Sequence, residues 1–65
     1  MEKNVIAQRL QKLRGVTPRR QVATACNIKV SALANYESGI RIPRDDVKVR
    51  LAAYYGVSVE SIFYK

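Results

Sequence analysis

The sequence predicts an all-α fold of five short helices in a single domain that spans residues 1–65. Apolar residues recur at helical spacing along the chain, and no stretch alternates apolar and polar residues long enough to indicate a strand. Glycine or proline interrupts the chain between most of the helical stretches. A chain of 65 residues has room for one small hydrophobic core, which short packed helices can form.

The first predicted helix lies in the stretch NVIAQRLQKLRG, and Gly15 is placed to end it. Three apolar residues share one side of this helix: Ile6, Leu10 and Leu13. A second helix is expected over about residues 18–25, with Thr17 as its N-cap. Pro18 would occupy the first helical position, where the missing proline N–H costs nothing.

The third predicted helix, VSALANYES, has two different faces. It follows a tight turn at Asn27, because asparagine tolerates a left-handed backbone better than other non-glycine residues do, and it ends at Gly39. Leu33 and Tyr36 lie on an apolar arc, with Glu37 at its edge. The opposite arc is small and neutral: Val30, Ser31, Ala34, Asn35 and Ser38. Such an arc is too polar for a core and too uncharged for an ordinary surface of a basic protein.

Two more helices are expected after a loop. Pro43 prevents the third helix from continuing, so IRIPRDD is predicted as a loop. Asp45 and Asp46 mark the first turn of a fourth helix, where carboxylates are favourable near the positive end of the helix dipole. That helix carries a broad apolar arc and ends at Gly56. Ser58 is the expected N-cap of a short fifth helix in VESIFY.

The charge of the chain points to a polyanionic partner. Twelve Lys and Arg residues against five Asp and Glu residues give a net charge of +7 and a pI near 10.1. Nucleic acid is the first candidate, and a basic charge that only keeps the protein soluble is the alternative.

Several classes of function are disfavoured. The sequence has no His and one cysteine, Cys26, which we expect to be buried near the turn with no general base beside it. We therefore expect no enzyme, no metal site, no cofactor and no small-molecule ligand. The lone cysteine fits a reducing compartment, and no apolar run reaches the roughly 20 residues that span a bilayer. The N-terminal stretch MEKNVIAQRLQ lacks the apolar core of a signal peptide, so we expect a cytoplasmic protein without a membrane partner.

Residues at about 18–37 have the pattern of a helix-turn-helix. Two short helices meet at a tight turn, and the second has one core arc and one neutral arc. The residues expected at the crossing of the two helices are Ala23, Asn27, Ile28 and Leu33. A plain helical hairpin in a bundle needs the same spacing, so this pattern alone leaves both possibilities open.

The run from Ile6 to Phe63 resembles the Xre-type helix-turn-helix family, which includes the lambdoid phage repressors and Cro proteins. The resemblance rests on IAQRLQKLRG, QVATACNIKVSALANYESG, RIPRDD and LAAYYGVSVESIF taken together. It departs from the family at Asn27, where glycine is more common, and in the connection RGVTPRR, which is about two residues shorter than usual. The resemblance implies a compact lambda-repressor-like fold, sequence-specific binding to double-stranded DNA, and a homodimer on an inverted repeat.

The resemblance also implies roles for individual residues. Val30, Ser31 and Asn35 would read bases: Val30 against a thymine methyl, Ser31 by hydrogen bonds, and Asn35 paired with an adenine. The residues expected to contact phosphates are Arg19, Arg20, Lys29, Arg41 and Arg44. Glu37 would form a partly buried structural ion pair with Arg14. The cations expected to be solvated surface charges are Lys12, Lys48 and Arg50.

The C-terminal stretch carries more apolar surface than so small a domain easily covers. Ile62 and Phe63 most simply complete the core, and the residues expected at a dimer interface are Val57, Val59, Phe63 and Tyr64. We expect a repressor in a bacterial cell or a phage-infected host. One alternative is the DNA-binding antitoxin of a toxin pair, which usually adds a toxin-binding segment, and the residues beyond Phe63 are expected to be too few to form one. Another is a non-specific nucleic-acid binder, but most tyrosines fall on core arcs and not on an exposed aromatic platform.

Overall fold

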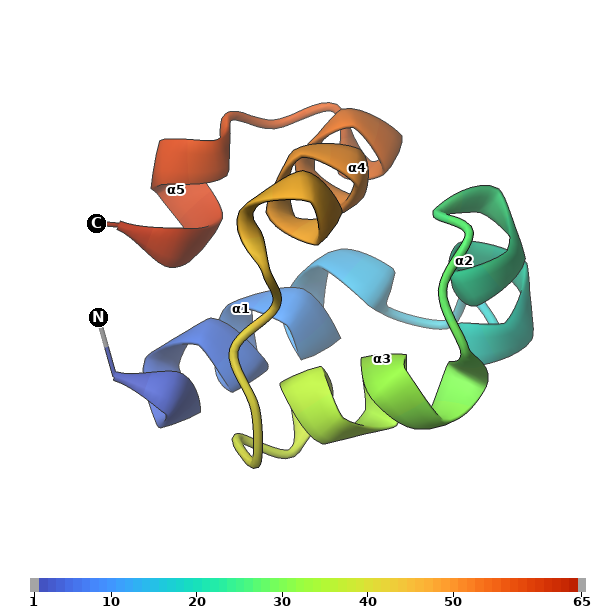
Figure 1. Ribbon diagram of the computed structural model, residues 1–65, viewed down its shortest axis with the longest axis horizontal. Helices are drawn as coiled ribbons and strands as arrows, with labels where there is room; N and C mark the ends of the chain where they lie inside the picture. The colour runs from blue at the N-terminus through green and yellow to red at the C-terminus, as the bar shows by residue number, and fades with distance from the viewer. Residues whose placement is uncertain (1, 65) are drawn as a thin grey trace.

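The computed structural model describes residues 2–64 and confirms the predicted all-α fold. Five helices succeed one another along the chain: α1 (Lys3–Arg14), α2 (Arg19–Ala25), α3 (Val30–Glu37), α4 (Asp45–Tyr55) and α5 (Val59–Phe63). Within residues 2–64 there is no strand. Figure 1 shows α1 in the middle of the molecule, with α3 along one side of it and α4 and α5 on the other.

A single hydrophobic cluster joins the five helices. Its buried members are Ile6, Leu10, Val22, Ala23, Cys26, Leu33, Tyr36, Val47, Leu51, Ala52, Ile62 and Phe63. Each large apolar side chain that leaves water in this way contributes about 1.5–3 kcal/mol to folding. Because α2 and α5 have only seven and five residues, their stability depends on this packing and not on helix formation alone.

The side of α1 that faces the core is rotated slightly from the predicted one. Ile6 and Leu10 are buried as expected, and Ala7 is buried beside them. Leu13 is predicted to share this side, but it is 37% exposed. Including Ala7 moves the centre of the buried face around the helix, which leaves Leu13 at its edge and open to solvent.

The predicted signals at the helix ends are mostly correct. Asn27 has a φ of 56°, so the turn before α3 does use a left-handed backbone. The Ser58 hydroxyl caps α5 by accepting from the Ser61 N–H at 3.1 Å. Asp45 and Asp46 occupy the first turn of α4, where their negative charges interact favourably with the positive end of the helix dipole.

The predicted start of α2 is wrong by one residue. The helix begins at Arg19, and Pro18 stands in the N-cap position with an extended backbone (ψ 141°) and without a side-chain cap. The Thr17 N–H instead donates to the Arg14 carbonyl at 3.0 Å, which makes Thr17 part of the turn that leaves α1. The short connection therefore uses Thr17 to close one helix and not to open the next.

Tyr55 carries an unusual hydroxyl. Among the described residues, its oxygen is the one buried side-chain polar atom without a hydrogen-bond partner. Burial raises the pKa of Tyr55 from 10.0 to about 12, and the negative charge of Glu37 acts in the same direction. The folded protein therefore holds the phenol neutral at pH values where an unfolded chain would ionise it.

Tyr55→Phe should make the free energy of unfolding less dependent on alkaline pH. Because the folded pKa lies above the unfolded one, the contribution of the phenol to stability is complete below pH 10.0 and is lost as pH rises toward about 12. Urea unfolding at several pH values between neutrality and about pH 11 would measure this. At neutral pH the variant should be about as stable as the parent, since no hydrogen bond of Tyr55 is removed.

Tyr54→Phe is the matched control, because Tyr54 is more exposed and accepts a hydrogen bond from Gln21 at 3.3 Å. It should keep the pH dependence of the parent. If the free energy of unfolding fell equally with rising pH in the parent and in both variants, the role given to the Tyr55 phenol would be contradicted.

Candidate nucleic-acid interface

A tight turn sets α3 against α2. The Ile28 N–H donates to the Ala23 carbonyl at 2.9 Å across this turn, and the Cys26 N–H donates to Val22 at the same distance. Ala23 is buried, so the two helices meet at a small side chain. Leu33, on the core side of α3, is fully buried. Ile28 is half-buried and packs on the same cluster. The four residues predicted at the crossing therefore surround this turn, with Asn27 exposed at its tip.

The two faces of α3 have different surroundings. Leu33, Tyr36 and Glu37 are buried against the rest of the molecule. On the opposite face Val30 is 44% exposed and Ser31 is exposed, while Ala34 and Asn35 are half-buried. The neutral arc predicted from the sequence is therefore a real surface at the edge of the molecule, and its side chains project little.

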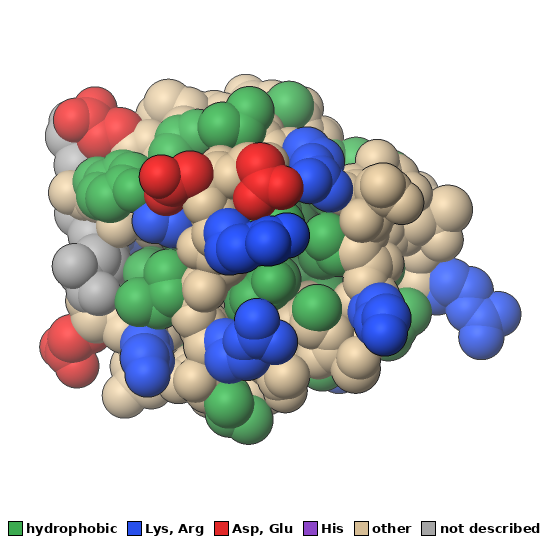
Figure 2. Space-filling model, in the orientation of Figure 1, with side chains coloured by type: hydrophobic (Ala, Val, Ile, Leu, Met, Phe, Trp, Pro, Cys, Tyr) green, Lys and Arg blue, Asp and Glu red, His purple; other side chains and the backbone are tan. Residues whose placement is uncertain are grey.

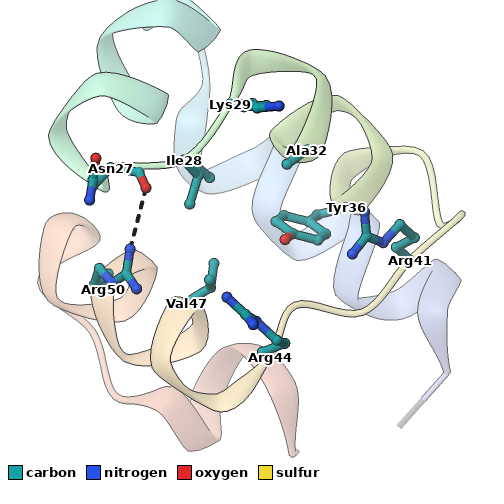
Figure 3. A pocket seen from close by; sticks show the side chains of 9 residues that line it. All are labelled: Asn27, Ile28, Lys29, Ala32, Tyr36, Arg41, Arg44, Val47 and Arg50. Carbon is teal, nitrogen blue, oxygen red and sulfur yellow. Dashed lines mark hydrogen bonds between the residues drawn. The ribbon is translucent and has the colours of Figure 1, made fainter.

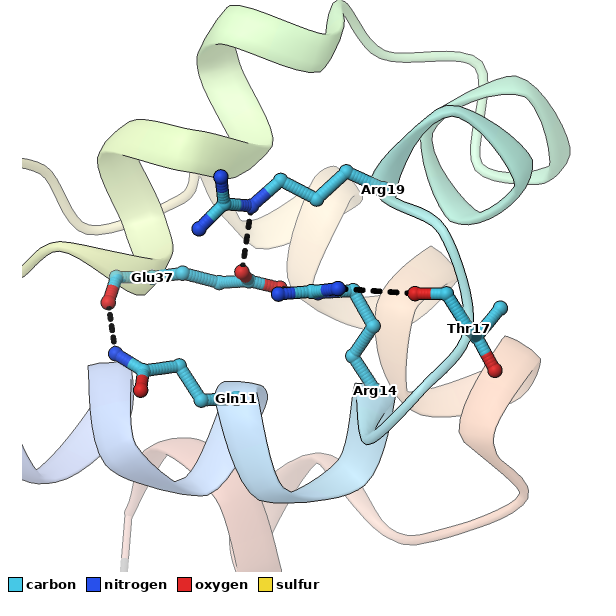
Figure 4. A network of polar contacts seen from close by, with 5 residues as sticks. All are labelled: Gln11, Arg14, Thr17, Arg19 and Glu37. Carbon is cyan, nitrogen blue, oxygen red and sulfur yellow. Dashed lines mark hydrogen bonds and ion pairs between the residues drawn. The ribbon is translucent and has the colours of Figure 1, made fainter.

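The Glu37 carboxylate lies at the meeting point of three helices (Figure 4). Its side chain is 0% exposed, and each of its oxygens accepts from a different arginine. Arg14 Nε, from α1, donates to Oε2 at 2.8 Å, and Arg19 Nε, from α2, donates to Oε1 at 2.9 Å. Gln11 adds a bond from its side-chain amide to the Glu37 backbone carbonyl. The sequence indicated one arginine here, and the structure has two.

These contacts compensate for the burial of a charge. A carboxylate removed from water is costly unless it is paired and hydrogen-bonded, and Glu37 is both. The hydrogen bond from Arg14 to Glu37 raises the pKa of the Arg14 guanidinium. Arg14 also donates to the Thr17 carbonyl at 2.9 Å, so the same side chain fixes the connection between α1 and α2. The position of α3 is thereby tied to both neighbouring helices.

The other predicted phosphate contacts are exposed cations: Arg20, Lys29, Arg41 and Arg44. Arg44 lies 3.7 Å from Asp46 in a loose surface pair, which leaves it free to contact another anion. Arg19 differs from these four because its Nε is bound to Glu37, although its side chain is still 41% exposed. Figure 2 shows several Lys and Arg side chains spread over one face of the molecule.

An open groove of about 630 Å³ runs between α3 and α4 (Figure 3). Its lining residues are Asn27, Ile28, Lys29, Ala32, Tyr36, Arg41, Arg44, Val47 and Arg50. Ile28 from the turn and Val47 from α4 point toward each other inside it, and cations from the turn, the loop and α4 lie around it. The fold thus brings Lys29, Arg41 and Arg44 to one groove beside α3.

Sequence reasoning missed the structural roles of two arginines. Arg50, expected to be a solvated charge, donates to the Cys26 carbonyl at 3.0 Å and to Asp46 at 2.7 Å. The spacing of four residues between Asp46 and Arg50 was a signal for the second contact. Arg9 donates to the Ser61 and Ile62 carbonyls at 3.0 and 3.3 Å, which joins α1 to α5. No sequence pattern indicates that contact.

The four predicted dimer residues differ in exposure. Phe63 is wrongly placed among them, because it is 1% exposed and belongs to the core. Val59 is half-buried and packs on the same core. Tyr64 is exposed and accepts a hydrogen bond from Lys48 at 2.8 Å, with the Lys48 ammonium 4.7 Å from the ring centre. Lys48 is therefore also more than a solvated charge.

Val57 contributes to a different surface. It lines a second hollow, of about 460 Å³, between α1 and α5. The residues around this hollow are Arg9, Lys12, Leu13, Val57, Ser61 and Ile62. The exposed Leu13 side chain thus lines the same hollow as Val57, together with the basic residues Arg9 and Lys12.

Other kinds of site are not found in the part of the chain that the structure describes. Residues 2–64 contain no group of three or more His, Cys, Asp or Glu side chains that could hold a metal ion. None of the helices within the same range has the length and apolar character that crossing a bilayer requires.

A family model described as helix-turn-helix matches residues 6–62, which includes all of α2, α3 and α4. Neither the curated proteins nor the solved structures contain a match to the chain.

Glu37→Gln should destabilise the fold by about 3 kcal/mol, because it leaves two arginines without the buried charge that they contact. Urea unfolding followed by circular dichroism measures this. Asp45→Asn serves as the control, since the Asp45 side chain is 95% exposed and lies 3.6 Å from Lys48. The free energy of unfolding of Asp45→Asn should fall by less than about 1 kcal/mol. Equal losses in the two variants would contradict the importance assigned to the Glu37 contacts.

Proposed function

This chain belongs to the Xre/Cro-type helix-turn-helix family, and on that premise we propose that it is a transcriptional repressor of phage or mobile-element type. Its family consists of DNA-binding regulators. The proposed repressor binds an inverted-repeat operator in duplex DNA as a homodimer. One observation carries the proposal: α3 presents a short, neutral, partly exposed arc, and Lys29, Arg41 and Arg44 line the groove beside the same helix.

Base reading is assigned to Val30, Ser31 and Asn35. A major groove about 12 Å wide admits a helix whose exposed side chains are short. Val30 and Ser31 lie in the first turn of α3 and are exposed, as residues at base edges must be. Asn35 is half-buried one turn later, where its amide can pair with the two hydrogen-bonding atoms on the edge of an adenine.

Phosphate contacts are assigned to the cations around this arc. Lys29, Arg41 and Arg44 lie along the groove beside α3, and Arg20 is exposed on α2. Such contacts hold the protein in register on the duplex without reading sequence. Arg19 remains in this set although it binds Glu37, because a guanidinium has five N–H donors and only its Nε is used there. The Arg19 side chain would then be held in position by Glu37 before the DNA binds.

The dimer interface is assigned to the hollow that contains Leu13 and Val57. Both side chains are apolar and exposed, and a second copy related by a two-fold axis would cover them. In such a dimer the two α3 helices would reach half-sites about 10 bp apart on one face of the duplex.

A binding selection on random duplexes tests the proposal as a whole. Repeated rounds should recover an inverted repeat whose half-site centres lie about 10 bp apart. Recovery of a single unrepeated site would contradict the dimer, and recovery of no common sequence would contradict specific binding.

Asn35→Ala should relax the sequence preference at one or two base pairs. Each lost preference should amount to about 1–3 kcal/mol, because the amide is assigned to a base edge. Competition binding with operators substituted at single positions measures this. Gln8→Ala, an equally small change on the exposed outer side of α1, should leave every preference unchanged.

Arg41→Ala should weaken binding to all duplexes alike. Because Arg41 is assigned to a phosphate, its loss should also reduce the slope of log K against log salt by about 1. Titrations at several salt concentrations, on operator and random duplexes, measure both effects. If Asn35→Ala and Arg41→Ala both caused the same uniform loss, the assignment of base reading to α3 would be wrong.

A further inference from the structure

Arg50 links α4 to the turn of the helix-turn-helix. Its Nη1 donates to the Cys26 carbonyl at 3.0 Å and to the Asn27 carbonyl at 3.4 Å, and Nη2 donates to the Asp46 carboxylate at 2.7 Å. Figure 3 shows the Arg50 side chain reaching from α4 to this turn. The contacts with the turn span more than twenty residues of sequence and join two elements that both line the groove.

The turn is a place where such a link matters. Carbonyls at the C-terminal end of a helix lack partners within the helix and carry the negative end of its dipole, so a cation there is favourable. Asn27 adopts a φ of 56°, a conformation that residues other than glycine rarely choose. A charged donor that binds the carbonyls of both Cys26 and Asn27 helps to hold this conformation.

Arg50 is itself held in position. Asp46 lies one turn earlier on α4, so its carboxylate orients the guanidinium toward the turn. The Cys26 thiol lies 3.7 Å from the Arg50 backbone carbonyl and donates a weak bond in the opposite direction. Cys26 and Arg50 therefore each donate a hydrogen bond to the other's backbone carbonyl, which connects the turn to α4.

We propose that Arg50 is a positioning residue for base recognition. Lys29 and the base-reading residues Val30 and Ser31 come directly after this turn, so the orientation of the turn determines where they meet the groove of the DNA. Arg50 lines the same groove of the protein as the phosphate-contacting cations, but its terminal nitrogens are bound to acceptors within the protein. This inference rests on the proposed function, because it gives Arg50 its effect through DNA recognition.

Arg50→Met tests the proposal with two kinds of measurement. On DNA, the ratio of affinities for the operator and a random duplex should fall about tenfold, while the salt slope stays unchanged. Without DNA, amide hydrogen exchange at Asn27 and Ile28 should become faster, while exchange at the core residue Leu10 stays the same. Arg44→Met is the matched control. It should weaken binding to both duplexes equally, lower the slope of log K against log salt by about 1 and leave amide exchange unchanged.

Arg50→Lys keeps the charge but loses the planar fork that reaches several acceptors at once, and it should lower the affinity ratio in the same direction. It also provides the test if the methionine variant does not fold. An unchanged ratio in Arg50→Lys, or a uniform loss with a reduced salt slope in Arg50→Met, would overturn the proposal. If the parent chain showed no sequence preference, the proposed function would fail. Unchanged amide exchange at Asn27 and Ile28 in Arg50→Met would overturn the positioning role independently of that function.

Discussion

The buried carboxylate of Glu37 is the interaction on which the position of α3 depends. An eight-residue helix is too short to be stable alone, so α3 exists because the rest of the molecule holds it. Apolar packing through Leu33 gives this helix a buried side, but apolar contacts are not directional. The two arginines on Glu37 add direction, because each bond requires α1 or α2 to lie at a fixed distance from α3. Arg50 does the same for the turn that precedes α3.

This arrangement separates the two tasks of a DNA-binding surface. Charge that serves the fold is buried or bound to protein groups, as in Arg14 and Arg50. Charge proposed to serve binding is exposed around the groove, as in Lys29, Arg41 and Arg44. The arc of α3 beside this groove is left neutral and short, as proposed for a surface that approaches base edges while the cations contact phosphates. Arg19 is bound to Glu37 and is also proposed to contact a phosphate, so both tasks are assigned to one side chain.

The sequence predicted features that depend on local chemistry. Apolar spacing located the five helices, and the preference of asparagine for a left-handed backbone identified the turn at Asn27. The family resemblance also supplied the Arg14–Glu37 pair, but other features that depend on how distant segments meet were missed or wrong. Nothing local shows that Arg50 reaches a turn 24 residues away, or that Phe63 lies wholly in the core and leaves no surface for a dimer interface. The start of α2 was misplaced because Thr17 has cap chemistry but is used by the turn before it.

Amide chemical-shift mapping during titration with an operator duplex tests most directly whether this framework presents α3 to DNA. The largest shift changes are expected in α3 between Val30 and Asn35 and at Arg41 and Arg44 in the adjoining loop, with small changes in the buried parts of α1 and α5. Changes concentrated on α1 and α5, with α3 unaffected, would contradict the central claim that a helix held by Glu37 is the surface that reads the duplex.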